Sequence, residues 1–407
     1  MTSTQRPRRV QPLDRPWLGQ RSVLLATPVR TDVAAIRAAL LRFAHLHPDS
    51  PIASRLDAAT GRWLPVPPHQ RAAHVERLVT TAPDPDPDDL EAHVRRYRVT
   101  APDLPVVVVV SPTAVLTEIS HAVGDAATFT RLTMAISRAS GLDELAHRTG
   151  TRTVLRALRS GLRAHRQDWA DFVRHRVAPP RTTTSGPPQQ CRPDFTGTVV
   201  PAAALREITR WRNAHARGTS ITSVLTTMTH RAFTDLGVPV RDDGLWALID
   251  IRGLLPDAPH RWGNLSKSLY LTAALRDPAA VEAAMKQARD TSRALPALVL
   301  GSLTGAVATP QQPPTRAPRP DAVTLTFNSM PTLPGLADMD WVEGAGPRRF
   351  FGFGPSMGPE GLTVFAIRTR EHLELSASYD SSVISTDTAA KALAALTDPA
   401  ALLAAMG

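Results

Sequence analysis

The first half of the chain alternates between short apolar runs and segments in which apolar residues recur at helical spacing. The apolar runs predict strands over 22–29, 104–111 and 114–120. The helical spacing predicts one helix over 126–140 and an earlier one that Thr31 caps and that ends near Leu46. A proline follows His47 and disfavours helical backbone there, which sets the end of the earlier helix.

The second half contains the same mixture of elements. Helices are expected over 200–216, 219–236, 278–295 and 389–406. Strands are expected over 245–251 and 322–328, and as a hairpin over 362–369 and 372–379. Two proline-rich segments, 178–193 and 310–320, are predicted to be linkers. Because 407 residues are many for one core, we expect two α/β lobes.

Composition narrows the possible functions without naming one. Hydrophobic residues make up 43% of the chain and charged residues 21%, as in soluble globular proteins. The net charge is +10, but only three of the 47 basic residues are lysine, which is typical of a GC-rich genome. Aromatic residues make up only 5%, so we do not expect a nucleic-acid partner. A phosphorylated cofactor and an acidic protein partner fit the charge equally well.

The expected compartment is the cytoplasm. The first nine residues are polar and basic, unlike a secretory signal, and the apolar segment 296–307 is too short and too interrupted to span a membrane. Cys191 is the only cysteine, which excludes an internal disulfide and a cysteine-rich metal site. We therefore expect no membrane partner and no bound metal.

The segment Ser120-His121-Ala122-Val123-Gly124-Asp125 follows two predicted strands and precedes a predicted helix. An imidazole at the end of such an element is held rigidly yet remains reachable, as a general base requires. Asp125 either orients His121, as in a catalytic triad, or anchors the local backbone or an arginine. We favour the anchor, and Arg252, at the end of the predicted strand 245–251, is the candidate partner.

Two rival motifs are weaker. His45 and Asp49 have the same spacing, but they lie at the end of a helix with Pro48 between them. Gly354-Pro355-Ser356-Met357-Gly358 matches the G-x-S-x-G elbow of serine hydrolases, which requires a helix directly after the serine. A strand is predicted there instead, so a hydrolase that uses Ser356 is the less favoured alternative.

The segment 151–176 is predicted to be one amphipathic helix. Basic residues recur on one face at spacings of three and four, as Arg152, Arg156, Arg159, Arg163 and Arg166. Such a face is either simply solvated or a docking surface for phosphates or an acidic partner.

Several motifs, taken in order, resemble one superfamily. His121 to Asp125 resembles the H-x-x-x-D signature of chloramphenicol-acetyltransferase-like proteins, which include BAHD acyltransferases and the condensation domains of nonribosomal peptide synthetases. Asp250-Ile251-Arg252 followed by Trp262-Gly263-Asn264 is similar to the D-x-R and G-N segments of that superfamily. Thr326-Phe327-Asn328-Ser329 resembles the S-N strand of the superfamily. Phe351-Gly352-Phe353-Gly354-Pro355 resembles its D-F-G-W-G loop.

The resemblance implies a pseudo-dimer of two such lobes, residues 1–180 and 181–407, with mixed sheets and a central channel. A segment near 340–365 would cross to the first lobe. His121 would lie midway along the channel, with the Asp125–Arg252 pair as a structural element. The resemblance also implies a monomer without a permanently bound cofactor, whose co-substrate is acyl-CoA or a phosphopantetheinyl thioester on a carrier protein.

The expected activity is acyl transfer from the thioester to a hydroxyl or amine of a small metabolite in natural-product biosynthesis. His121 would be the general base. Candidates for holding the oxyanion or the substrate are Asn328, Ser329, Ser356, Ser120 and Gly124. Arg152, Arg156, Arg159 and Arg163 are candidates for docking the carrier protein or CoA. Condensation or cyclisation of carrier-bound substrates is the main alternative, although condensation domains usually have a second histidine where this chain has Ser120. A non-catalytic member of the fold is a further alternative.

Overall fold

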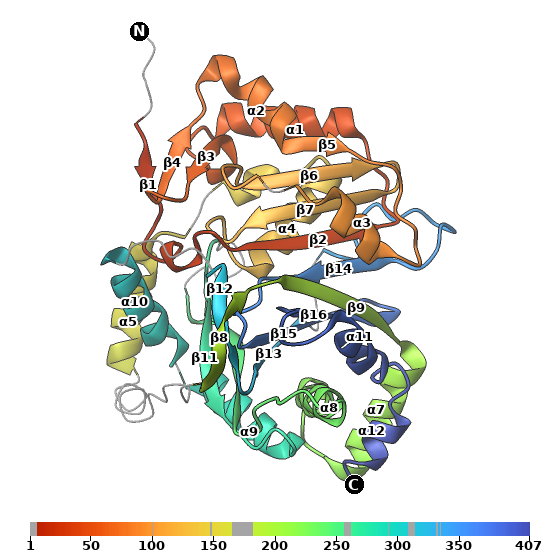
Figure 1. Cartoon of the computed structure of the whole chain (residues 1–407). Coiled ribbons are helices and arrows are strands. Elements are labelled where there is room, and N and C mark those ends of the chain that lie inside the picture. Colours follow the sequence, from red (N-terminus) through yellow and green to blue (C-terminus); the bar gives the residue numbers. More distant parts are fainter. Residues whose placement is uncertain are drawn as a thin grey trace.

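A computed structural model describes residues 6–99, 101–146, 149–164, 182–255, 262–291, 293–307, 314–330, 333 and 335–407. The chain forms two lobes, one above the other in Figure 1, and each is built on its own sheet. Among the described helices, none has the length and apolar character needed to cross a membrane.

The first lobe contains a five-stranded sheet in the order β14-β2-β7-β6-β5. Its strands are β2 (Arg21–Thr27), β5 (Val79–Thr81), β6 (Val106–Ser111), β7 (Ala114–Ser120) and β14 (Arg349–Phe353). Its helices are α1 (Val33–Leu46), α2 (Arg71–Leu78), α3 (Leu90–Tyr97) and α4 (Ala126–Ser137). A small sheet beside them contains β1 (Arg8–Arg9), β3 (Ser54–Asp57) and β4 (Arg62–Pro65).

The second lobe contains a six-stranded sheet in the order β11-β10-β13-β15-β16-β9. Its strands are β9 (Pro193–Pro201), β10 (Gly244–Asp250), β11 (Ser266–Thr272), β13 (Thr324–Met330), β15 (Gly361–Arg368) and β16 (His372–Asp380). Its helices are α7 (Ala202–His215), α8 (Ile221–Asp235), α9 (Pro278–Asp290), α11 (Thr386–Ala394) and α12 (Ala400–Ala404). The helices α5 (Thr151–Ala164) and α10 (Ala294–Val307) lie together at the left of Figure 1.

Strand β14 comes late in the chain yet belongs to the first sheet, where it pairs antiparallel with β2. A phenylalanine cluster joins the lobes at this point, because Phe351 and Phe353 of β14 pack with Phe195 of β9. The chain therefore crosses between the lobes, and this crossing fixes the two sheets against each other.

Strand β16 of the second sheet is buried on both faces. On β16, Leu373, Leu375 and Ala377 point into the core beneath the helices, whereas Glu374 and Ser376 point the other way. This is the period of two expected for a strand, but its polar face is not solvated, and all nine residues of β16 are buried. The polar face is therefore enclosed between the two lobes.

Four local predictions need correction. Asp32, not Thr31, caps α1, because its carboxylate accepts the Ala34 and Ala35 N–H groups. The predicted linkers contain strands β8 (Thr184–Gln190) and β12 (Arg316–Pro320), which pair antiparallel with each other. The predicted helix 278–295 is broken by the extended Thr291, and 389–406 divides into α11 and α12. Helix α5 is described to Ala164, so 165–176 lies outside the described residues.

Candidate active site

His121 lies directly after β7 and before α4, at the boundary between the lobes. Its backbone N–H donates to the Gln20 carbonyl at 2.9 Å. Nε2 lies 2.8 Å from the Ser22 hydroxyl on β2, the strand next to β7. Trp17 stacks on the imidazole at 5.2 Å between ring centroids, and Phe129 meets it edge-on at 4.7 Å. The ring is thus held by one stacked and one edge-on aromatic contact and at Nε2.

The environment keeps this imidazole neutral. Loss of hydration between the aromatic rings lowers the pKa of His121 to about 4, while the charge of Asp125 acts in the opposite direction. A neutral imidazole has one free lone pair, which is the form a general base needs. Nδ1 is buried and has no hydrogen-bond partner among the described residues.

Asp125 does not act as a simple acid beside the histidine. Its carboxylate caps α4 through the Thr128 N–H and also accepts the Leu265 N–H at 3.0 Å and the Ser266 hydroxyl at 3.0 Å. Arg252 donates to both oxygens, at 2.8 and 3.0 Å. Burial acts to raise the pKa of Asp125, but the charge and hydrogen bonds of Arg252 outweigh it and lower that pKa. The carboxylate is therefore charged and fully engaged.

The segment after Arg252 ties the second lobe to the histidine loop. Gly263 has a φ of +120°, which favours glycine, and its N–H donates to the Thr128 hydroxyl at 3.2 Å. The Asn264 amide then donates to the His121 carbonyl at 2.7 Å and to Asp14 at 2.8 Å. Both halves of the chain thus position the backbone that carries the imidazole.

A cavity of about 50 Å³ lies against the imidazole, with room for about four water molecules. The first lobe contributes Trp17, Ser22, His121, Asp125 and Ala126. The second lobe contributes Leu248, Asn264, Ser266, Ser268, Thr326, Asn328, Thr363 and Phe365, and the loop after β14 adds Pro355 and Met357. A larger substrate therefore requires neighbouring side chains to move.

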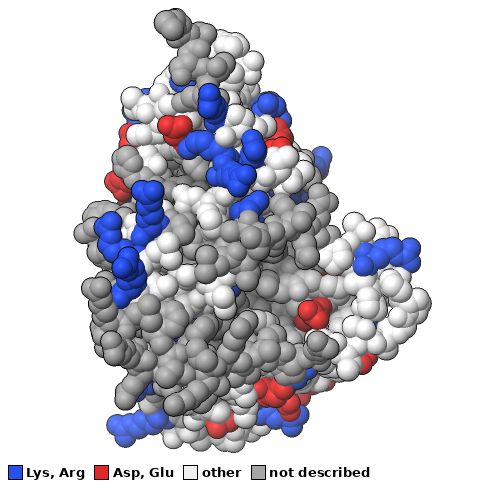
Figure 2. Space-filling model, turned by 90° about the vertical axis from the view of Figure 1, so that its left-hand side faces the viewer, with Lys and Arg blue, Asp and Glu red and all other residues white. Residues whose placement is uncertain are grey.

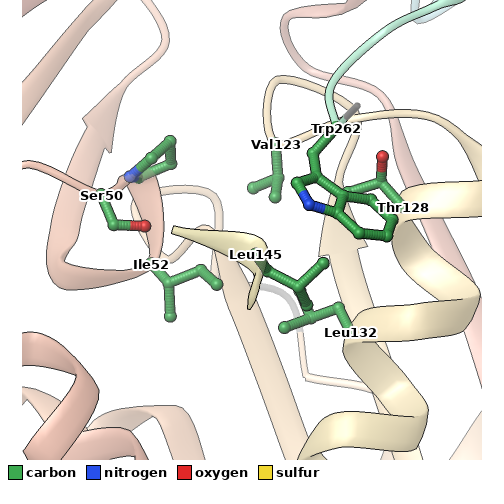
Figure 3. Close-up of a pocket in the computed structure, with 8 residues that line it drawn as sticks. Ser50, Ile52, Val123, Thr128, Leu132, Leu145 and Trp262 are labelled. Atoms are coloured by element: carbon green, nitrogen blue, oxygen red, sulfur yellow. The ribbon is translucent and has the colours of Figure 1, made fainter. Parts of the chain in front are cut away.

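A second pocket lies beside Val123 and Thr128, which bracket Asp125 in the chain, and its lining is mostly apolar (Figure 3). Val123 and Thr128 flank it, and the Trp262 indole reaches into it from the second half of the chain. Its volume is about 10 Å³, close to that of one water molecule. The guanidinium of Arg131 lies over the same indole at 4.5 Å. Trp262 therefore packs into the core of the first lobe and helps to hold the two lobes together.

Of the five candidates for holding the oxyanion or substrate, only Asn328 is among the residues that line the cavity. Ser329 is its neighbour on β13 and points to the opposite face, where it accepts a hydrogen bond from Thr222. Ser120 is buried and accepts the Ala122 N–H, and Gly124 packs so closely on Thr128 that a Cβ would lie 2.7 Å from its side chain. Ser356 lies in the loop after β14, outside the residues that line the cavity.

The rival motifs do not assemble into sites. His45 contacts Arg71, and Asp49 contacts Arg8. The only histidine downstream of Ser356 in the sequence is His372, which is committed to Glu374 at 2.9 Å. Ser356 is followed by a turn and then by β15, so the helix of a nucleophile elbow is absent from this described segment.

Sequence reasoning missed Trp17 and Ser22, which contact the imidazole directly. Neither carries a motif, and both come from a segment about 100 residues before the histidine. The one available signal for Ser22 was its place on an apolar strand, where a polar residue is unusual.

The basic face of α5 is exposed where it is described. Arg152, Arg156 and Arg159 are exposed, while Val154 and Leu158 pack into the core of the second lobe. The side chain of Arg163 lies outside the described residues. Figure 2 faces the side of the molecule with β1 and α5 and shows basic side chains gathered at the level of both elements.

Solved structures with the same architecture identify the fold. The first condensation domain of the calcium-dependent antibiotic synthetase, in complex with a substrate analogue, matches with a TM-score of 0.60 and 16% identity over 97% of this chain and 93% of that one. F. sporotrichioides TRI101, complexed with coenzyme A and T-2, matches with a TM-score of 0.57 and 12% identity over 92% and 94%. The condensation domain of the Monacolin K polyketide synthase MokA gives 0.60 and 12% over 98% and 97%.

No family model matches the sequence. No curated protein matches it either. The structural likeness confirms the predicted fold, an α/β protein of two lobes, which these condensation domains and TRI101 share.

Proposed function

We propose that this chain, which has the chloramphenicol-acetyltransferase-like fold, is an H-x-x-x-D acyltransferase that moves an acyl group from a thioester to a hydroxyl or amine of a small metabolite. The observation that carries the proposal is the neutral imidazole of His121 in a cavity that both lobes line. Because one chain supplies both walls of that cavity, a monomer is sufficient for the reaction.

His121 takes the proton from the acceptor, whose oxygen or nitrogen attacks the thioester carbonyl. The tetrahedral intermediate then collapses, the carbon–sulfur bond breaks, and the imidazolium returns the proton to the leaving thiolate. We assign the basic lone pair to Nε2, because this nitrogen already faces a hydroxyl group, that of Ser22. General base catalysis contributes typically about 10²–10⁴-fold, so the remaining acceleration comes from holding both substrates in place.

Asn328 is the proposed donor to the developing oxyanion. It is the one member of the five sequence candidates for this role that lines the cavity. An amide N–H placed before the reaction begins stabilises the negative charge without reorganisation. The co-substrate is acyl-CoA or a carrier-bound acyl group, and no permanently bound cofactor takes part in these steps.

The test uses the His121→Ala variant and a panel of acyl-CoA thioesters with small alcohols and amines, followed by mass spectrometry of the products. We expect at least a hundredfold loss of product formation with an unchanged circular dichroism spectrum. His45→Ala is the matched control, since His45 has the same spacing to an aspartate but contacts Arg71. A His121→Ala variant close to the wild-type rate would show that the base is another group.

Condensation or cyclisation of carrier-bound substrates is the second candidate. The observation that favours it is the exposed row of Arg152, Arg156 and Arg159 on α5, which is complementary to an acidic carrier protein.

A further inference from the structure

The wall that the second lobe contributes to the His121 cavity contains buried polar atoms that lack partners among the described residues. Thr326 and Asn328 lie two residues apart on β13, so they share the face toward the cavity, whereas Leu325 and Phe327 point into the core. Thr363 of β15 is in register with Thr326 in the parallel pair, so the two threonines are neighbours on that face.

None of these three side chains is satisfied within the described part of the protein. Thr326 Oγ1, Thr363 Oγ1 and Asn328 Oδ1 are buried and have no hydrogen-bond partner there. The three residues are 2%, 3% and 9% exposed, so within the fold only water or a ligand held in the cavity can bond these atoms. Burying such groups unpaired destabilises a fold, and valine or leucine would fill the same space without this cost. Their presence therefore calls for an explanation.

One explanation is a ligand that pairs with these atoms. The charges around the cavity limit the chemical class of that ligand. Among the residues that line it, Asp125 is the one carboxylate, and Arg252 holds both of its oxygens. No lysine or arginine lines the cavity within the described residues. A carboxylate, a phosphate or an ammonium group would therefore be buried here without an opposite charge, which is strongly unfavourable.

We infer that Thr326, Thr363 and Asn328 form a subsite that hydrogen-bonds the hydroxyl or amide groups of an uncharged acceptor. The inference rests on the proposed function, because it treats this cavity as the place where the acceptor meets His121. Each threonine hydroxyl can donate and accept, and Asn328 Oδ1 adds a fixed acceptor, which leaves the amide N–H for the oxyanion. A site of this kind selects against an analogue that lacks the matching hydroxyl, because its own polar atoms then stay unpaired.

The near-isosteric variants Thr326→Val and Thr363→Val test the inference in two ways. Each removes a hydroxyl that has no partner in the free protein, so the Tm is expected to stay the same or rise. With acetyl-CoA as donor and propane-1,2-diol against propan-1-ol as acceptors, each variant should lose about tenfold in kcat/KM for the diol. The rate with the mono-alcohol should fall less than the rate with the diol, so the ratio of the two kcat/KM values is the readout.

Thr117→Val is the matched control. Thr117 is also a fully buried strand residue, but its hydroxyl bonds the Thr133 hydroxyl at 2.6 Å, so its removal should lower the Tm. A similar fall for Thr326→Val and Thr363→Val would overturn the inference, because their hydroxyls would then be satisfied in the free protein. An unchanged diol preference would overturn it as well.

The Tm is measured without substrate. Failure of the subsite inference can therefore be distinguished from failure of the proposed acyltransferase function. A wild-type protein that is inactive with every thioester and acceptor would reject the acyltransferase function. Unsatisfied threonines in that inactive protein would still leave the Tm of the valine variants unchanged or raised.

Discussion

Arg252 donates two hydrogen bonds, of 2.8 and 3.0 Å, to Asp125, which lies 127 residues earlier in the chain. The pair is buried, and the same carboxylate caps α4 and accepts the Leu265 N–H of the second lobe. The aspartate of the H-x-x-x-D motif thus holds together the two halves between which His121 lies.

This arrangement predicts that the pair matters at least as much for stability as for rate. Arg252→Ala leaves a buried carboxylate without its counter-charge, so we expect a loss of about 3–5 kcal/mol in the free energy of unfolding. Asp125→Asn removes the charge that pairs with Arg252 and puts an amide N–H where an oxygen now accepts hydrogen bonds, so we expect a comparable loss. Urea unfolding measures both values. Arg77→Ala is the control, because the Arg77–Asp103 pair is exposed and should contribute less than about 1 kcal/mol. A fully stable but inactive Asp125→Asn would instead favour a triad role.

Ser22→Ala is predicted to lower kcat about tenfold, with a small fall in the Tm because one buried hydrogen bond is lost. The hydroxyl fixes the orientation of the imidazole through Nε2, and its loss frees the ring to rotate between Trp17 and Phe129. Steady-state kinetics with one thioester would measure the effect, and Ser22→Thr, which keeps the hydroxyl, should restore part of the rate. A faster Ser22→Ala enzyme would mean that Ser22 competes with the acceptor for Nε2.

The pH dependence of stability follows from the lowered pKa of His121. The unfolded imidazole takes up a proton below about pH 6.5, but the folded one does so only near pH 4, so the unfolded state binds more protons in this window. Stability should therefore fall by about 2 kcal/mol between pH 7 and pH 5 through this group alone. Denaturant unfolding of wild type and His121→Gln at both pH values isolates the contribution. An equal pH dependence in the two proteins would contradict the lowered pKa.

The pH dependence of kcat/KM should report the titration of His121 as well. For the free enzyme, kcat/KM is expected to stay constant from neutral pH down to about pH 5 and to fall only near pH 4. An acid limb centred near 6.5 would show that the imidazole is hydrated as in a free peptide.

The basic face of α5 predicts a difference between free and carrier-bound donors. If it docks an acidic carrier protein, replacing Arg152, Arg156 and Arg159 by alanine should raise KM about tenfold for the acyl-carrier and leave KM for acyl-CoA unchanged. Added salt should likewise raise the KM of the wild-type protein for the acyl-carrier, because it screens the charges. Alanine at Arg206 and Arg210, which are exposed on α7, serves as the control. An equal effect of both variants would show that only net charge matters.

The sequence by itself determined the elements and the location of the histidine. The spacing of hydrophobic residues predicted the strands before His121 and the helix after it, and the order of short motifs pointed to the fold that the solved structures confirm. These signals are local, so one sequence contains them in full.

Only the tertiary structure decided what surrounds the imidazole. Trp17, Ser22, Thr326 and Thr363 come from separate strands and loops, and no spacing in the chain relates them. Strand β16 was predicted from its alternating pattern, but that pattern does not say what covers its polar face. The face is buried because the two lobes dock, and this long-range event is not encoded in a single strand. Alternation along β13 likewise placed Asn328 in the cavity and turned Ser329 away from it.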